Sequence, residues 1–380
     1  MIPLYESIQG IKTLSPEEKE KLIKLDKLYG EYCQLDRDLR DHKTVTNVEE
    51  EMKKFFKYRE MGQKYFPQLK CPGTKYDHSL VEMGKTLRKQ FNEFPCFLSK
   101  YYVEMLDHTI KNQEFFIGKR SATWYTTTNA QKPSMENFYK ALQTVRENPY
   151  EEVSDNSRNI DAKTASSMIK SHIDKMGYKW KVSLKDNMLP RMSVNPDQTM
   201  YIKKAAKFSK VDIDGLCAHE VDGHIGRRYY GLKTGLCLFQ YGLLSRNILD
   251  EGLAIYNSLH KVEKPKSNIL FNIALKTIIV YLLQDHDFCE VFDYCRELDK
   301  NVPNSALFKS IIRLKRELGD CSIPGCCGDD QSYFCGYQIV KDMNDQLRDD
   351  VLKYNIGPNQ ITDLPDIKKF LELNKFESLI

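Results

Sequence analysis

Two short segments of this 380-residue chain carry residue types that bind metals and move protons. Residues 219–224 read His-Glu-Val-Asp-Gly-His, and residues 250–254 read Asp-Glu-Gly-Leu-Ala. Zinc is bound in proteins by imidazole nitrogens and carboxylate oxygens, and a catalytic zinc ion keeps one position open for water. A glutamate beside the first histidine can take a proton from that water, whose pKa the metal lowers to about 7. The two segments therefore contain the parts of a hydrolytic zinc site.

The spacing of the two histidines differs from that of the common zinc-peptidase motif. In the common motif the histidines are at positions i and i+4, one helical turn apart. His219 and His224 are at i and i+5. On a regular helix of about 3.6 residues per turn, this spacing places them roughly 140° apart. Both can face one metal only where the helix widens or ends, and Gly223 is the residue that would permit a π-bulge or an unwound last turn.

Each of these residues also has an ordinary structural explanation. A lone buried histidine is more often a hydrogen-bonded core residue than a metal ligand, but a buried pair with a glutamate between them would be costly without a metal or partners. Glu251 begins an apolar helix, where it could simply complement the helix dipole. Gly252 and Ala254, on the same helix, are small enough to let another helix pack closely. Two histidines and a carboxylate also suit Fe(II), so a non-haem iron enzyme stays an alternative.

Composition places the chain among ordinary soluble globular proteins. Charged residues make up 29% and hydrophobic residues 41% of the sequence. The formal net charge of +4 is too small to argue for nucleic acid as a partner. No apolar run approaches the roughly 20 residues of a membrane span, and the N-terminus lacks the pattern of a secretory signal.

The cysteines favour a cytoplasmic location. There are eleven, an odd number scattered through the chain, which is typical of reduced thiols. Four lie close together in the sequence: Cys321, Cys326, Cys327 and Cys335. Their spacing lacks a paired Cys-x-x-Cys arrangement, so structural thiols are favoured over a second metal site.

Hydrophobic periodicity predicts helices through the first 150 residues. The run Ser15-Pro16-Glu17-Glu18 is a typical helix start, with a capping serine, proline at the first position and glutamate at the third. Further helices are expected at 48–65, from 79 onward, around 97–106 and at 135–145. The polar stretch 147–157 interrupts the pattern. We therefore expect a helical N-terminal region at 1–150 and a catalytic region at 151–380.

Strands are expected only after the next predicted helix, at 161–176. Segments 180–184, 191–194 and 200–203 alternate in polarity or are bounded by turn residues, which predicts a small antiparallel sheet with hairpin connections. The expected fold class is α+β, mainly helical, with this sheet beside the metal-binding helix. The edge of such a sheet could bind an extended peptide as an additional strand.

The two chemical segments together resemble motifs of a known family. They are similar to the His-Glu-x-x-x-His and Glu-Gly-Leu-Ala motifs of the microtubule-associated tyrosine carboxypeptidases and of their bacterial relatives, the QEGLA-motif proteins. Arg227 and the pattern Asp330-x-x-Tyr333-x-x-Gly336 fit the same family, and the similarity spans about residues 189–336. Two residues depart from the family pattern. Asp250 stands where the bacterial motif has glutamine, and Asp329 stands where the family has lysine.

The resemblance implies a zinc metallopeptidase of the carboxypeptidase type. Zinc would be bound by His219, His224 and Glu251, with Glu220 activating the water, and Tyr333 could donate a hydrogen bond to the oxyanion of the intermediate. Family members typically remove a C-terminal aromatic residue, tyrosine on α-tubulin in animals, so the expected partner is a polypeptide C-terminus. A tubulin tail is not assumed. An endopeptidase with the same metal chemistry is the main alternative.

A carboxypeptidase must also hold a free carboxylate, which needs at least one nearby cation. The candidates are Arg191, Lys203, Lys204, Arg227 and Arg228. Arg227 is favoured because it follows the second histidine on the same helix and matches the family, whereas each of the others is more often a solvated surface charge. The absence of the family lysine at position 329 could weaken binding of the carboxylate.

Overall fold

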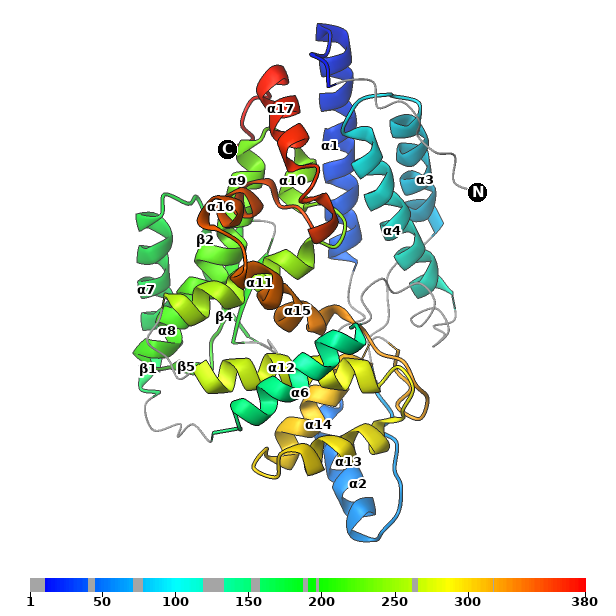
Figure 1. The fold of residues 1–380 in the computed structure, drawn as a ribbon, viewed down its shortest axis with the longest axis vertical. Coiled ribbons are helices and arrows are strands. Elements are labelled where there is room, and N and C mark those ends of the chain that lie inside the picture. Colours follow the sequence, from blue (N-terminus) through cyan, green and yellow to red (C-terminus); the bar gives the residue numbers. More distant parts are fainter. Residues whose placement is uncertain are drawn as a thin grey trace.

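The computed structural model describes residues 11–39, 45–70, 78–118, 133–151, 158–186, 191–195, 198–261, 266–316 and 318–380. These residues are mainly helical, with strands in one two-stranded and one three-stranded sheet, which confirms the predicted α+β class. In Figure 1, α1, α3 and α4 lie together at one end of the molecule, and α2, α6, α12, α13 and α14 lie at the other. Helices α11 and α15 lie between these two groups.

The N-terminal part consists of successive helices, as predicted. They are α1 (Pro16–Asp38), α2 (Val48–Glu60), α3 (His78–Asn92), α4 (Ser99–Ile117) and α6 (Met135–Glu147). The start of α1 is the predicted capping box, in which the Ser15 hydroxyl accepts from the Glu18 N–H and the Glu18 carboxylate accepts from the Ser15 N–H. Helix α2 is shorter than predicted, because the chain leaves it in a turn at Gly62 with a φ of 69°.

The three-stranded sheet is mixed, which corrects the predicted antiparallel arrangement. Its strands, in spatial order, are β2 (Lys181–Lys185), β4 (Thr199–Lys203) and β3 (Met192–Asn195). Strands β3 and β4 are antiparallel as predicted, whereas β2 runs parallel to β4. The prediction treated consecutive strands as neighbours, but β4 lies between β2 and β3. The connecting residues 187–190 and 196–197, where hairpin turns were expected, lie outside the described residues.

A second, two-stranded sheet joins β1 (Ile160–Asp161) to β5 (Lys207–Phe208) in antiparallel pairing. Between β1 and β2 lies α7, and α8 follows β5. The helical elements from this point to the C-terminus are α7 (Ala162–Lys175), α8 (Lys210–Leu216), the π-helix η2 (Cys217–Ile225), α9 (Gly226–Lys233), α10 (Cys237–Tyr241), α11 (Arg246–His260), α12 (Lys266–Leu282), α13 (Phe288–Leu298), α14 (Asn304–Lys315), η3 (Asp329–Gln331), α15 (Ser332–Lys341), α16 (Asp345–Tyr354), η4 (Pro358–Gln360) and α17 (Leu364–Asn374).

Helices from both halves of the sequence contribute to the same hydrophobic cores. One core joins α1, α3 and α4 to α10, α16 and α17, a second joins α2 and α6 to α12, α13 and α14, and a third lies among α7, the three-stranded sheet and η2. The buried Asp26 of α1 links the halves by accepting hydrogen bonds from the backbone N–H groups of Cys237 (2.7 Å) and Leu238 (3.0 Å). The division of the chain at residue 150 stays a prediction. Most of the polar stretch on which that prediction rests, residues 152–157, lies outside the described residues.

Small residues let α11 pack closely on two neighbouring helices. A Cβ atom at Gly252 would overlap the carbonyl group of Gly336 on α15, and a Cβ atom at Gly336 would overlap the carbonyl oxygen of Ile248. Ala254 lies against Gly223 of η2. The expectation that Gly252 and Ala254 allow close helix packing is therefore confirmed. No helix in the described ranges has the length and hydropathy needed to cross a membrane.

Replacing Gly252 with alanine should therefore destabilise the fold. The added methyl group would press on backbone atoms of α15, which cannot move without displacing the helix, so we expect Gly252→Ala to lower the free energy of unfolding by about 3 kcal/mol. Urea-induced unfolding followed by circular dichroism measures this. Gly226→Ala is the matched control, since its Cβ atom would meet Tyr178 Oη at 3.1 Å and Leu352 Cδ1 at 3.4 Å, both side-chain ends. Equal losses in the two variants would contradict the close packing of α11 on α15.

Candidate metal centre

The two histidines lie on a π-helix, so the predicted widening of the helix is confirmed. Element η2 continues α8 and leads directly into α9. At its end the N–H of Gly226 bonds to the carbonyl of Val221, five residues earlier, which is the π-helical pattern. This backbone turns His219 and His224 toward each other, with ring centroids 5.1 Å apart and ring planes at 84°. The i+5 spacing therefore brings both imidazoles to one side of the helix.

Gly223 lies within the π-helix, as predicted, and its lack of a side chain has a second effect. It does not adopt a positive φ, so conformational freedom is not its visible role. A Cβ atom at this position would lie 3.0 Å from the Cβ and 3.2 Å from the Cα of Ala254 on α11. The absence of a side chain at Gly223 thus lets η2 approach α11, which carries the third candidate ligand.

Glu251 of α11 completes the cluster. Its Oε2 atom lies 3.7 Å from Nε2 of His219 and 3.6 Å from Nε2 of His224, and one donor atom from each of the three residues lies within 4.8 Å of the others. Three ligands held about 2.1 Å from a tetrahedral zinc ion would be about 3.4 Å apart. Within the described part of the chain, this is the one group of three such residues whose donor atoms converge in this way.

The Glu251 carboxylate supplies the decisive test of whether these residues fit a metal. Its Oε2 atom is buried and has no hydrogen-bond partner among the described residues. A buried carboxylate oxygen without a donor is costly, so such atoms are normally paired or bound to a cation. The three residues therefore have the composition, the spacing and the unsatisfied oxygen expected of a metal site.

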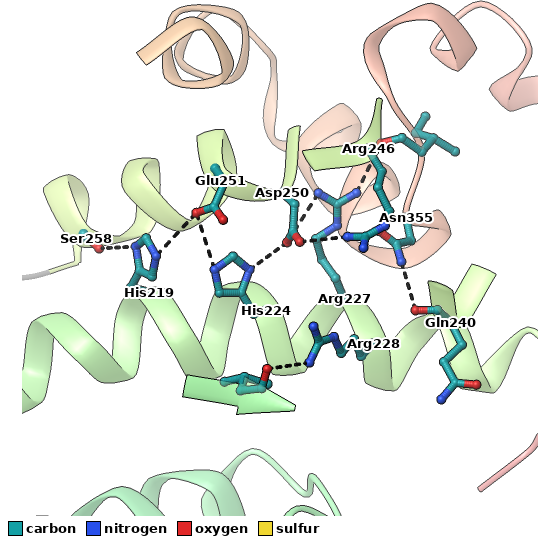
Figure 2. A network of polar contacts seen from close by, with 12 residues as sticks. His219, His224, Arg227, Arg228, Gln240, Arg246, Asp250, Glu251, Ser258 and Asn355 are labelled. Atoms are coloured by element: carbon teal, nitrogen blue, oxygen red, sulfur yellow. Dashed lines mark hydrogen bonds and ion pairs between the residues drawn. The ribbon is translucent and has the colours of Figure 1, made fainter. Parts of the chain in front are cut away.

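The outer nitrogen of each imidazole makes a polar contact that orients the ring (Figure 2). Nδ1 of His224 lies 2.9 Å from Oδ1 of Asp250. Nδ1 of His219 lies 3.5 Å from the hydroxyl of Ser258, which itself donates to the carbonyl of Ala254. A carboxylate can only accept, so Nδ1 of His224 carries the proton and Nε2 is left to face Glu251. This arrangement is typical of metal-binding histidines.

Burial and neighbouring negative charges have opposite effects on the pKa values of the two histidines. Burial lowers the pKa of His219. Burial acts in the same way on His224, but the negative charges of Asp250 and Glu251 outweigh it and raise its pKa well above the ordinary value. Burial would raise the pKa of Asp250, yet the charges of His224 and Arg227 hold it well below its usual range. Asp250 is therefore an anion that orients His224.

Comparison with known proteins identifies the family. The family described as "Microtubule-associated tyrosine carboxypeptidase" matches residues 49–373, which is most of the chain. The chain belongs to this family. Its similarity to the mouse "Putative tyrosine carboxypeptidase MATCAP2" is 30% identity over 170 residues, and to the human "Microtubule-associated tyrosine carboxypeptidase 1" it is 29% identity over 129 residues. The resemblance predicted from the motifs is confirmed.

These matches cover only part of each relative. The match to the mouse relative spans 42% of this chain and 31% of that protein. The match to the human relative spans 33% of this chain and 26% of that protein. Each match therefore covers less than a third of the relative's length. Among solved structures, a putative lipoprotein from Colwellia psychrerythraea is similar at a TM-score of 0.41 and 12% identity, over 95% of this chain and 77% of that one.

Arg227 was expected to bind substrate, but the structure places its side chain in the interior. Its side chain is 1% exposed, with Nη1 3.6 Å from Asp250 Oδ1 and Nη2 donating to the carbonyl of Ile356. Arg246 holds the other carboxylate oxygen of Asp250 at 3.3 Å (Figure 2). Arg227 thus stabilises the anion behind His224 and has no exposed surface to offer a substrate. Burial lowers its pKa to about 10, which still leaves it charged at neutral pH.

The other predicted cations lie along the three-stranded sheet. Arg228 donates to the carbonyl of Val194 in β3, and Arg191 pairs with Asp212 at the start of α8. Lys204 pairs with Asp186 at 2.6 Å, and Lys203, at the end of β4, lies opposite Lys185 of β2. None of these contacts reaches the metal cluster. A role for Arg191 and Lys203 in substrate binding stays a prediction.

The remaining predicted residues are Glu220 of η2 and Tyr333 of α15. Glu220, within η2, acts electrostatically on both His219 and Tyr333. Tyr333 lies in the first turn of α15, and the charge of Glu251 together with burial raises its pKa well above the ordinary value. Two cations that the sequence predictions did not single out act on Tyr333, Lys276 through a contact 4.6 Å from the ring centre and Arg313 through its charge. The only indication in the sequence was Asp330 of the family motif, which contacts both Lys276 and Arg313 in the structure.

The cysteines at 321, 326, 327 and 335 are buried. Burial raises the pKa of Cys321 to about 12 and that of Cys335 to about 11, so both stay protonated at neutral pH. Among the described residues, these four cysteines form no group of converging metal donors, and all four are buried in the core.

The contacts of Arg227 predict a large loss of stability when it is removed. Arg227→Met leaves Asp250 buried with one partner fewer, so we expect the free energy of unfolding to fall by about 3 kcal/mol. Arg191→Met is the control, because this arginine is 39% exposed and Asp212 also pairs with Arg158, so a change below about 1 kcal/mol is expected. Urea unfolding of both variants measures the difference. An Arg227→Met protein of normal stability that bound substrate poorly would restore the original prediction.

Proposed function

We propose that this chain is a zinc-dependent carboxypeptidase that removes an aromatic, tyrosine-like residue from the C-terminus of a protein or peptide. The observation that carries the proposal is the buried Oε2 of Glu251, which has no hydrogen-bond partner and lies within 3.7 Å of the Nε2 atoms of two oriented histidines. Membership of the carboxypeptidase family supports the reaction class. Two imidazoles and one carboxylate are the ligand set of several catalytic zinc sites.

Each residue of the site has a distinct role in the proposed reaction. His219, His224 and Glu251 would hold the zinc ion, which supplies a Lewis acid and an activated water at neutral pH. Glu220 accepts a proton from the attacking water and returns it to the departing amine. Tyr333, whose hydroxyl is protonated at neutral pH, donates a hydrogen bond to the oxyanion that develops on the scissile carbonyl. Asp250, Arg227 and Arg246 keep His224 in the required orientation.

The names of the relatives support the proposed substrate. Both the mouse and human relatives are described as tyrosine carboxypeptidases, and the human protein is also described as microtubule-associated. We therefore infer that the substrate is a polypeptide C-terminus ending in an aromatic residue, and a tubulin-like tail is one such substrate. An endopeptidase would use the same zinc chemistry but would not need a free C-terminal carboxylate.

The proposed role of Glu220 is tested by incubating a peptide library with the protein and analysing the C-termini by mass spectrometry. Wild type should shorten peptides by one C-terminal residue. Glu220→Gln should be slower by a factor of about 10² to 10⁴, because it cannot accept the proton. Asp222→Asn, on the same helix, is the control, since Asp222 contacts His172 and Lys261 and none of the proposed ligands. Equal trimming by Glu220→Gln, or no trimming by wild type, would refute the proposal.

The proposed zinc site predicts the metal content of the protein. Protein purified without added metal should contain about one zinc ion per chain, as measured by inductively coupled plasma mass spectrometry. Asp250→Asn should weaken zinc binding by about 10- to 100-fold in competition with a chelator, because His224 loses its anionic partner. Asp222→Asn should bind zinc as tightly as wild type. Iron in place of zinc would favour the non-haem iron alternative.

A further inference from the structure

A group of charged side chains from three elements lies next to Tyr333 and is not used in the proposed chemistry. It consists of Lys276 of α12, Arg313 of α14 and Asp330 of η3. The guanidinium of Arg313 holds Asp330 with two hydrogen bonds, from Nε to Oδ2 and from Nη2 to Oδ1. Lys276 Nζ lies 3.7 Å from the same Oδ2 atom. Asp330 thus holds two cations beside each other.

The ammonium group of Lys276 makes no hydrogen bond to Asp330. A distance of 3.7 Å is beyond a hydrogen bond, so its ammonium has only an electrostatic contact with Asp330. It also lies 4.6 Å from the centre of the Tyr333 ring, in a cation–π contact. Its side chain is 25% exposed and that of Arg313 is 41% exposed, whereas Asp330 is 5% exposed. The two cations are therefore partly exposed, while the carboxylate that positions them is covered.

The group carries more positive than negative charge. Besides Lys276 and Arg313, the charge of Arg316 acts on Asp330 and on Lys276. Burial lowers the pKa of Lys276, as expected for an ammonium that has lost water without gaining a full partner. A second carboxylate entering beside Asp330 would complete the hydrogen bonding of Lys276 and improve the balance of charge.

The packing of α15 on α11 places this group beside the candidate metal ligands. Gly336 contacts Gly252, the residue directly after Glu251, and Tyr333 lies one helical turn before Gly336. Of the causes that raise the pKa of Tyr333, the charge of Glu251 is the largest. Tyr333 is therefore within reach of the charge of Glu251 and also holds Lys276 against its ring, 4.6 Å from the ring centre. A peptide that reached the metal ligands with its last scissile bond would extend its terminal carboxylate past this ring.

We propose that Lys276 and Arg313, positioned by Asp330, bind the terminal carboxylate of the substrate and so restrict the site to C-terminal residues. This inference rests on the proposed carboxypeptidase function and specifies how that site recognises a free C-terminus. Arg227, the cation favoured from the sequence, is buried against Asp250 and is not available for this role. The cations at 276 and 313 also supply the charge that the absence of the family lysine at position 329 put in doubt.

The test compares two forms of one peptide ending in Glu-Tyr, with a free C-terminal carboxylate or with an amide. Wild type should release tyrosine from the acid at least about 100-fold more efficiently, in kcat/KM, than tyrosine amide from the amide. Lys276→Met should lower kcat/KM on the acid by about 10- to 100-fold, mainly by raising KM, and should reduce the ratio of acid to amide activity. Lys276→Arg should retain most of the preference for the acid. Arg313→Gln, a second removal of charge, should reduce the same acid-to-amide ratio.

Lys309→Met is the matched control, because Lys309 is an exposed lysine of α14 that pairs with Glu49. It should behave as wild type on both peptides, and thermal unfolding of every variant reports whether the fold is retained. Wild-type protein that releases tyrosine from neither peptide, or that cuts internal bonds in both equally, would overturn the proposed function. Wild-type protein that prefers the acid, with Lys276→Met and Arg313→Gln keeping the full preference, would overturn only the role of this charged group.

Discussion

The close contact of α11 with both η2 and α15 is the constraint on which the candidate site depends. Glu251 can reach two histidines on another helix only because Gly223 lets η2 lie against Ala254. One residue beyond Glu251, Gly252 lies against Gly336 and fixes α15 on the other side. A side chain at any of these glycines would push the helices apart, and a shift of about 1 Å is enough to spoil a catalytic constellation. The three helices therefore position Glu251, the histidines and Tyr333 together.

A series of connected charged side chains holds His224 on the side away from Glu251. Asp250 is the centre of that series, because its two oxygens contact His224, Arg227 and Arg246 (Figure 2). Replacing the glutamine of the bacterial motif with aspartate adds a buried negative charge, which would be costly alone. Here the two arginines offset it. The negative charge is then available to hold the His224 ring, so the departure from the motif preserves the ligand geometry.

Several local features could be predicted from the sequence because they depend on neighbouring residues. The capping box at Ser15 and Glu18 fixed the start of α1, and the i+5 spacing of the histidines together with Gly223 predicted a widened helix. Residue types and spacing indicated a metal site, and the resemblance to the family implied the ligand set that converges in the structure. Pairing of the strands was predicted less well, since alternation identifies strands but not their order. In the structure β4 lies between β2 and β3, and the alternation of polar and apolar residues within a strand does not specify its neighbours.

The sequence by itself determined the chemistry available, since two imidazoles, two glutamates and a tyrosine occur in a pattern that few other functions require. Only the tertiary structure decided which charged side chains lie beside those groups. Arg227 follows the second histidine by three residues, yet its helix turns it into the interior against Asp250. Lys276 and Arg313 are distant in sequence from the motif, yet α12 and α14 bring them to Asp330 and Tyr333. The physical reason is that a side chain's role depends on which face of its helix is buried, and only the packing of other helices sets that face.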